Sequence, residues 1–298
     1  MIDKIINENK DILSSNNLEK INIGFTNLIY SVADKYIIKI CKDKENEDNF
    51  NNEINFYLKN TNNKYIPKLY RYHRKENDDD FSYEIIEKLK GKSLYYLWHT
   101  YNEEERKQII IEISNLMKSF HSIKGKTYDW GEYITNRILI NFNKCLQLNL
   151  FSEQDKIKMF SIIDKMKMYL KSNDFRLVHS DIHFDNLVMC ENKELKIIDF
   201  ETAIYAPIDF ELDIFLRMCN YPMKYASEET EKYVREEDYK NIERYLKEDY
   251  KELFEGIYYN ERHCIYDLEA YLRLLPEFPK HTELKEIILK DIEIIENY

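Results

Sequence analysis

Glycine, proline and cysteine are all scarce in this chain, which has five of each among 298 residues. The cysteines are dispersed, include no close pair and leave at least one unpaired; they stand at positions 41, 145, 190, 219 and 264. This pattern argues against a disulfide framework or a structural zinc site and suits a reducing compartment. The sequence also has no apolar run long enough to span a bilayer, and its N-terminus has no secretory architecture. We therefore expect a cytoplasmic protein that does not engage a membrane.

What the chain does have is enough apolar content for a packed core and an uneven distribution of charge. Hydrophobic residues make up 44% of the sequence, and the mass of 36.4 kDa allows one large or two small domains. Residues 1–200 carry 31 acidic and 31 basic side chains, whereas residues 201–298 carry 24 acidic and 13 basic ones. The net charge of −11 therefore arises in the C-terminal third.

Such an acidic region would attract a cationic ligand and repel nucleic acid, so we expect no nucleic-acid partner. The alternative is that exposed helices in this protein are simply acidic. Several carboxylates could meet a cationic ligand, and the candidates are Glu211, Glu228, Glu229, Glu231 and residues 236–238.

The segment from Leu177 to Leu187 contains two polar residues that are five positions apart, Asp181 and Asn186. No helical or strand period joins them, which predicts a loop that follows a short strand. A third polar residue, Asp199, follows the apolar run 195–198. The charged turn 191–194 predicts a hairpin that returns Asp199 to the loop.

These three residue types fit phosphoryl transfer. That reaction needs one carboxylate to receive the proton of the acceptor hydroxyl and oxygen ligands for the Mg²⁺ ions that neutralise the nucleotide phosphates. We assign the first role to Asp181 as general base. We assign Asn186 and Asp199 as metal ligands, because an amide carbonyl and a carboxylate suit a hard cation.

The two segments resemble the catalytic and metal-binding motifs of the aminoglycoside phosphotransferase family, which is related to protein kinases. The usual pattern there is His-Gly-Asp-x-x-x-x-Asn, followed by Ile-Asp-Phe-Gly or Ile-Asp-Phe-Glu. Here it stands as His179-Ser-Asp to Asn186 and as Ile198-Asp-Phe-Glu, with Ser180 in place of the glycine and Phe184 where proline or glycine is common. The resemblance implies an α+β, bilobal protein-kinase-like fold. Its small, β-rich nucleotide-binding lobe would be residues 1–88, and its larger, mostly helical catalytic and acceptor-binding lobe residues 89–298.

The resemblance also assigns nucleotide-binding residues in the first lobe. Lys39 lies between isoleucines in the strand 35–40, and Glu53 lies beside the apolar stripe of the helix 50–59. In the kinase pattern such a lysine reaches the α- and β-phosphates and is held by the glutamate. Glu45 and Glu47 are alternatives if the helix begins earlier.

Two further segments are assigned by the same resemblance. The phosphate-covering loop would be the turn within residues 21–32, with Gly24, Thr26 and Asn27 as its contacts. An ordinary hairpin turn would have the same sequence. In the strand 81–89, Ile86 would line the back of the adenine pocket, while the Glu87 carbonyl and the Leu89 amide would bind the edge of the base. Because these contacts to the base use backbone atoms, the side chains do not indicate whether the nucleotide is ATP or GTP.

Three residues outside these motifs are also compared with the family pattern. His121, at the end of the helix 103–122, is interpreted as structural, because the family has a similar Leu-x-x-Leu-His helix end. In the segment 206–215, either Asp213 or Asp209 would match the aspartate that braces the catalytic loop in the family.

The sequence therefore predicts a small-molecule kinase that transfers the γ-phosphoryl group of ATP or GTP to a hydroxyl, with an aminoglycoside as the first acceptor. Other acceptors in the family are macrolides, choline, homoserine and sugars. Two different functions stay open. The alternating set His179, Asp181, His183 and Asp185 could ligate metal in a hydrolase, and a catalytically weak nucleotide-binding protein would bind without turnover.

Overall fold

The computed structural model describes residues 1–13, 17–21, 27–77 and 80–298, and its chain forms two compact units. The first comprises residues 1–116, 181–203 and 221–240; the second comprises residues 117–180, 204–220 and 241–298. The boundaries are not contiguous in sequence, because the catalytic segment after residue 180 packs with the N-terminal part of the chain. The expected lobe boundary at residue 88 comes from the family resemblance, whereas these units are defined by contacts within the chain. The lobe boundary therefore stays a prediction.

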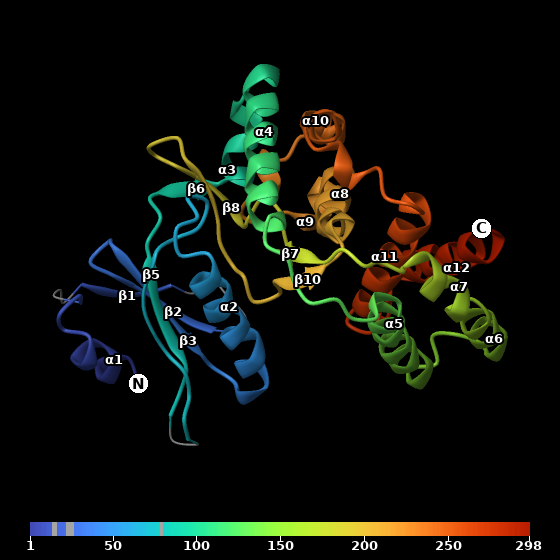
Figure 1. The fold of residues 1–298 in the computed structure, drawn as a ribbon, viewed down its shortest axis with the longest axis horizontal. Coiled ribbons are helices and arrows are strands. Elements are labelled where there is room, and N and C mark those ends of the chain that lie inside the picture. Colours follow the sequence, from blue (N-terminus) through green and yellow to red (C-terminus); the bar gives the residue numbers. More distant parts are fainter. Residues whose placement is uncertain (14–16, 22–26, 78–79) are drawn as a thin grey trace. The chain divides into compact units, whose positions relative to one another are not determined.

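The first unit is built on an antiparallel sheet in the order β1-β2-β3-β5-β4 (Figure 1). Its strands are β1 (Leu18–Ile21), β2 (Asn27–Val32), β3 (Tyr36–Cys41), β4 (Leu69–His73) and β5 (Tyr83–Glu87). The accompanying helices are α1 (Ile2–Glu8), α2 (Glu47–Lys59), α3 (Leu94–Leu97) and α9 (Pro222–Tyr225).

Helices α1 and α2 pack on opposite faces of this sheet, which explains the nearly continuous apolar sequence of β3 (Figure 1). Ile38 and Ile40 share a core cluster with Ile5 of α1, whereas Cys41 clusters with Phe50 of α2. Because successive side chains alternate between faces, Lys39 lies on the α2 face of the sheet. Strand β3 therefore presents apolar side chains to both faces of the sheet, and Lys39 is the charged residue on the α2 face.

A second sheet of the first unit carries the catalytic segment. It has the order β6-β8-β9, with β6 (Gly91–Ser93), β8 (Leu187–Cys190) and β9 (Leu195–Ile197). The hairpin β8–β9 is the predicted one, with Leu187 opposite Ile197. Gly91 is required where β6 meets β8, since a Cβ atom there would lie 2.3 Å from the carbonyl oxygen of Met189.

The second unit is mostly helical. Its described elements are α5 (Trp130–Gln147), α6 (Glu153–Ser161), α7 (Ile163–Tyr169), α8 (Leu212–Asn220), α10 (Ile242–Asp249), α11 (Tyr259–Leu274), α12 (Thr282–Asn297) and the paired strands β7 (Arg176–Val178) and β10 (Ile204–Ala206). The longest helix, α4 (Glu103–His121), runs from the first unit into the second. Helices α6 and α7 are separated at Ile162, whose buried side chain joins the core together with Met159 and Met166.

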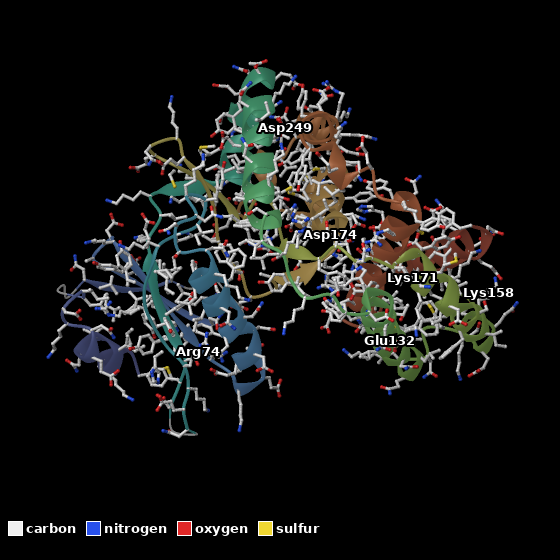
Figure 2. All side chains as sticks on the ribbon, in the orientation of Figure 1. Arg74, Glu132, Lys158, Lys171, Asp174 and Asp249 are labelled. Carbon is white, nitrogen blue, oxygen red and sulfur yellow. The ribbon has the colours of Figure 1, made fainter. Side chains whose placement is uncertain are left out.

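The α+β class is confirmed: strands prevail near the N-terminus and helices from residue 103 onward. Many charged side chains are exposed, and Arg74 and Glu132 are two of those labelled in Figure 2. Among the described residues, none of the helices has the length and apolar character that a membrane crossing would need.

Candidate active site

The structure brings Lys39 of β3 and Glu53 of α2 together. The Lys39 Nζ atom donates to Glu53 Oε2 over 2.5 Å, and both side chains are buried. The helix begins at Glu47, as the alternative allowed, but Glu47 accepts a hydrogen bond from the Ser82 hydroxyl instead. The pairing follows from the sheet, because only the odd-numbered side chains of β3 face α2.

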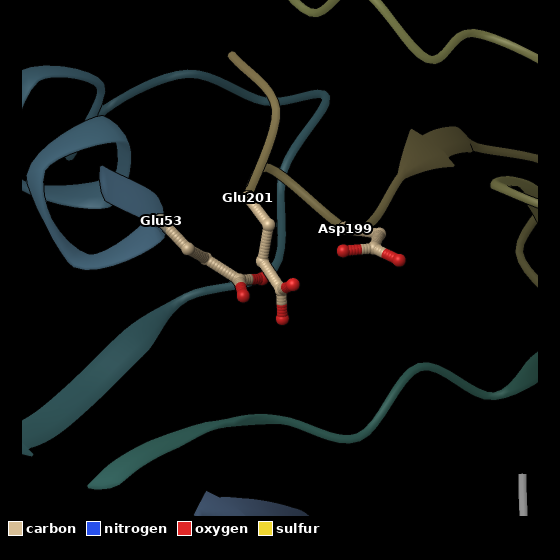
Figure 3. A group of neighbouring side chains, drawn as sticks. All are labelled: Glu53, Asp199 and Glu201. Carbon is tan, nitrogen blue, oxygen red and sulfur yellow. The ribbon is translucent and has the colours of Figure 1, made fainter. Parts of the chain in front are cut away.

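Two more carboxylates meet the same ammonium group. Lys39 Nζ lies 2.8 Å from Glu201 Oε1 and 3.6 Å from Asp199 Oδ1. Glu201 also accepts a hydrogen bond from the Asn27 side chain at the start of β2. Figure 3 shows the Glu53 and Glu201 carboxylates close together, with Asp199 on the same segment as Glu201. The sequence prediction omitted Glu201, although the acidic end of the motif 198–201 was a signal for it.

Burial and charge act in opposite directions in this group. Burial by itself would lower the pKa of Lys39, but the surrounding carboxylates raise it well above its ordinary value. Burial raises the pKa of Glu53 to about 7, although Lys39 lowers it. Glu84 lies opposite Lys39 on β5, and burial raises its pKa well above the ordinary value. The group therefore holds more acidic side chains than one ammonium can neutralise.

The catalytic loop places Asp181 and Asn186 in contact. The Asn186 Nδ2 atom donates to the Asp181 carbonyl oxygen over 3.0 Å and to Asp181 Oδ2 over 3.2 Å. The Asn186 carbonyl accepts the Ile198 amide over 3.0 Å, which joins the loop to the residue before Asp199. The hairpin thus brings all three predicted catalytic and metal residues into one unit of the protein.

His183 and Asp185 lie beside Asp181 in the same loop. The His183 Nε2 atom is 3.7 Å from Asp181 Oδ2, and the Asp185 amide donates to His183 Nδ1 over 3.3 Å. Burial would lower the pKa of His183, but the nearby carboxylates of Asp181, Asp185 and Asp199 raise it. Burial raises the pKa of Asp185, whose carboxylate accepts from the Ser93 hydroxyl.

The residue that braces the start of this loop is Glu211, not Asp213 or Asp209. Its fully buried carboxylate accepts the amides of His179 and Ser180, each over 2.8 Å, just before Asp181. The sequence interpretation had instead placed Glu211 among the carboxylates open to a cationic ligand. That was wrong, because the buried Glu211 carboxylate is occupied by these two amides. The two candidate aspartates pair elsewhere, Asp209 with an arginine of α11 and Asp213 with an arginine of α8.

Ser180 has a φ of 61°, in the left-handed region that favours glycine. This backbone conformation gives a physical reason for the glycine that is usual at this point of the motif. A serine there costs about 1–2 kcal/mol, and the hydrogen bond from its amide to Glu211 offsets part of this cost. His121 is structural as predicted: its ring is buried between Tyr250 and Glu211, at 2.9 Å and 3.2 Å.

The oxygen donors at this site fit a hard cation such as Mg²⁺. Because Asn186 uses Nδ2 toward Asp181, its Oδ1 atom is the donor left for a cation, and the Asp199 carboxylate is half exposed. Within the described parts of the chain, the one acidic or histidine group close enough to share an ion is Glu53, Asp199 and Glu201. The alternating histidines and aspartates of the loop do not form such a group, which removes the support for a zinc hydrolase.

The residues assigned to the nucleotide base and phosphates are only partly described. Ile86 is buried near the end of β5, the Glu87 amide donates to the Lys68 carbonyl, and the Lys88 amide donates to the Lys35 carbonyl. Asn27 is buried beside Glu201. Gly24 and Thr26 lie outside the described residues. The roles of Ile86, Glu87, Leu89 and Asn27 therefore stay predictions.

The acidic candidates for a cationic ligand differ in their surroundings. Asp238 is used internally, since it pairs with Arg106 at 2.8 Å. Glu229 accepts from the Tyr96 hydroxyl over 2.9 Å, and Tyr96 lies against the ring of Tyr233. Glu228, Glu231, Glu236 and Glu237 are exposed.

Comparison with known proteins agrees with this geometry. Residues 17–245 match the model of the phosphotransferase enzyme family. A search of curated protein sequences found no match.

Solved structures of similar fold include the ADP-bound aminoglycoside phosphotransferase APH(2'')-Ib, with a TM-score of 0.68 and 16% identity over 99% of this chain and 97% of that one. The gentamicin complex of APH(2'')-IIa has a TM-score of 0.67 and 15% identity, with 99% and 96% covered. Its streptomycin–ATP ternary complex has a TM-score of 0.62 and 16% identity, with 98% of each chain covered. The resemblance read from the motifs and the protein-kinase-like α+β fold are thereby confirmed.

Proposed function

The chain belongs to the phosphotransferase enzyme family, and on that premise we propose that it transfers the γ-phosphoryl group of ATP or GTP to a hydroxyl of a small molecule. The first acceptor to consider is an aminoglycoside. Macrolides, choline, homoserine and sugars are the alternatives.

The observation that carries this proposal is the contact of Asp181 with Asn186, in a loop whose hairpin also supplies Asp199. Asp181 would orient the acceptor hydroxyl and take its proton as the oxygen attacks phosphorus. Asn186 and Asp199 would hold Mg²⁺, which when bound neutralises charge on the phosphates. Lys39, held by Glu53, would position the α- and β-phosphates.

A cationic acceptor is favoured by charge. Asp185 and Glu229 are acidic groups in the same compact unit as Asp181, and Glu229 is bound to a tyrosine that lies against a second tyrosine. Carboxylates and aromatic faces both attract ammonium groups. Two of the similar structures are named as complexes with gentamicin and streptomycin, which makes aminoglycosides the first class to test.

The test is Mg²⁺-dependent release of ADP or GDP by the purified protein, with ATP and GTP as donors and a panel of aminoglycosides, macrolides, choline, homoserine and sugars as acceptors. We expect release that is stimulated by one acceptor class and a phosphorylated product in which mass spectrometry finds one added phosphoryl group. Mg²⁺-dependent nucleotide binding without stimulation by any acceptor would contradict turnover, and the absence of nucleotide binding would contradict the kinase assignment itself.

The Lys39→Met variant links this test to the site. It removes the ammonium that contacts Glu53 and Glu201, so nucleotide-dependent turnover should fall at least about a hundredfold. The exposed Lys158→Met on α6 is the matched control and should keep the turnover of the wild type.

A further inference from the structure

We propose that His183 is a positioning residue that holds the Asp181 carboxylate in its reactive orientation through the Nε2–H group. This inference rests on the proposed function, because Asp181 is the general base only in that reaction. It adds a residue to which neither the motif nor the family match gives a role in phosphoryl transfer.

The first step of the argument is the state of the imidazole ring. Its Nδ1 atom accepts the amide hydrogen of Asp185, two residues along the same loop, over 3.3 Å. In the neutral ring one nitrogen carries hydrogen and the other accepts, so an accepting Nδ1 places the hydrogen on Nε2. The imidazolium form also carries a hydrogen on Nε2. The nitrogen that faces Asp181 is a donor in both forms.

The second step is where this donor points. The His183 Nε2 atom lies 3.7 Å from Asp181 Oδ2, the oxygen that also accepts from Asn186 Nδ2 at 3.2 Å. The same carboxylate oxygen is therefore approached from two sides by side chains of its own loop. At 3.7 Å the contact is an ion-pair distance, and contacts of catalytic groups commonly shorten when substrate binds.

The third step is the protected setting of the pair. The side chain of His183 is 20% exposed and that of Asp181 28% exposed, so water competes only partly for either group. Three carboxylates act on the ring: Asp181, Asp185 and Asp199. Of these, Asp181 is the carboxylate that Nε2 faces at ion-pair distance, which identifies it as the main partner of the ring.

A general base that must receive a hydroxyl proton gains from a fixed orientation, because a misplaced reacting group costs much of the rate advantage. Two donors on one oxygen restrict rotation of the carboxylate about its χ2 torsion. We therefore expect the loss of Nε2–H to lower kcat while leaving the nucleotide contacts of Lys39 and Asp199 intact.

Two substitutions distinguish positioning of Asp181 from a purely structural role of His183, in which Nδ1 holds the loop through the Asp185 amide. Glutamine places an amide nitrogen near the position of Nε2 but provides no acceptor near Nδ1. Asparagine places an acceptor oxygen near Nδ1 for the Asp185 amide but does not reach Asp181. The positioning role predicts that His183→Gln keeps activity and His183→Asn loses it, whereas a structural brace predicts the reverse.

The experiment measures kcat, KM for the acceptor and nucleotide affinity for the wild type, His183→Gln and His183→Asn. We expect His183→Gln to stay within about threefold of the wild-type kcat and His183→Asn to fall about tenfold or more, each with unchanged nucleotide affinity. Equal activity of the two variants, or a more active His183→Asn, would overturn the proposal.

A second measurement needs no acceptor and so distinguishes failure of this proposal from failure of the proposed function. The ring nitrogen shifts of His183 are compared by NMR at one pH in the wild type and in Asp181→Asn, with the exposed Asp164→Asn as control. Loss of the carboxylate that faces Nε2 should change the Nε2 shift, whereas Asp164→Asn should leave it unchanged. An unchanged Nε2 shift in Asp181→Asn would refute the contact even in an active enzyme.

Discussion

Two ion clusters of this protein differ in charge balance. In the first compact unit, the single ammonium of Lys39 meets Glu53, Glu201 and Asp199. In the second, the Arg262 guanidinium forms a two-point pair with Asp209, at 2.6 Å and 2.8 Å. Tyr266 completes that pair by accepting from Arg262 over 2.9 Å.

This difference in charge balance distinguishes a candidate binding site from an ion pair that stabilises the fold. A balanced pair with every charge hydrogen-bonded needs no other component, and its removal disturbs only stability. A cluster with excess carboxylate is costly unless protons or cations compensate it. The surplus around Lys39 is what the proposed binding of a metal–nucleotide complex would compensate, whereas the Arg262 pair stabilises the folded helical unit.

The largest expected effect is on the catalytic side. Asp181→Asn should lower kcat by about a thousandfold, because the amide cannot take the hydroxyl proton. Nucleotide affinity, measured by calorimetry, should change by less than about threefold, since Lys39 and Asp199 are untouched. Asp164→Asn, an exposed change of the same kind on α7, is the control. Near-wild-type turnover of Asp181→Asn would remove the general base from the mechanism.

Loss of the Arg262–Asp209 pair should lower the free energy of unfolding instead of turnover. Arg262→Met leaves the buried Asp209 carboxylate unpaired, which should destabilise the protein by about 3 kcal/mol. Thermal or urea unfolding measures this loss, and nucleotide affinity at low temperature should stay unchanged. Arg273→Met, an exposed change on the same helix, should have little effect on the unfolding midpoint. Similar midpoints for both variants would erase the distinction drawn between the clusters.

An intermediate effect is expected at the metal ligand. Asp199→Asn preserves the shape of the residue and its left-handed backbone, which asparagine tolerates at a φ of 69°. We expect nucleotide affinity in Mg²⁺ to fall at least about tenfold, because a carboxylate ligand is lost. With EDTA the variant and the wild type should bind nucleotide equally. A difference that persists in EDTA would show that Asp199 acts without the metal.

The smallest effect concerns an acidic group of the helical unit. Burial and the charge of Asp267 raise the pKa of Asp291 on α12 from 3.8 to about 7. In the pH window between these values the folded protein keeps a proton that the unfolded chain loses, so stability falls as pH rises. Asp291→Asn should therefore be more stable than the wild type by on the order of 2 kcal/mol at pH 8 and equally stable below pH 4, as measured by thermal unfolding.

The control for this prediction is the exposed Glu293→Gln on the same helix. It should follow the wild type at both pH values. A gain for Asp291→Asn that is as large at pH 4 as at pH 8 would assign the effect to packing rather than to ionisation.

Sequence reasoning found the residues that are close along the chain or alternate on one strand. Asp181, Asn186 and Asp199 belong to one loop and one hairpin, so spacing and turn signals were enough to predict their proximity. Lys39 and Glu53 lie in separate elements, yet strand alternation and the helix stripe gave their faces.

Sequence reasoning did not find the residues whose partners lie on another element. Glu211 is fully buried and binds two backbone amides of the loop. Its chain neighbours Asp209 and Asp213 are also acidic, and nothing in the sequence tells which of the three points toward the loop. Glu201 was overlooked because its partner, Lys39, lies on a distant strand.

The sequence by itself determined which residues form the candidate site, namely Asp181 with Asn186 in one loop and Lys39 with Glu53, because local spacing and strand alternation place those side chains. The tertiary structure alone decided which acidic residue braces the loop, how many carboxylates surround Lys39 and where His183 points. Those outcomes depend on contacts between residues far apart in the chain, and such contacts form only when the sheets and helices pack.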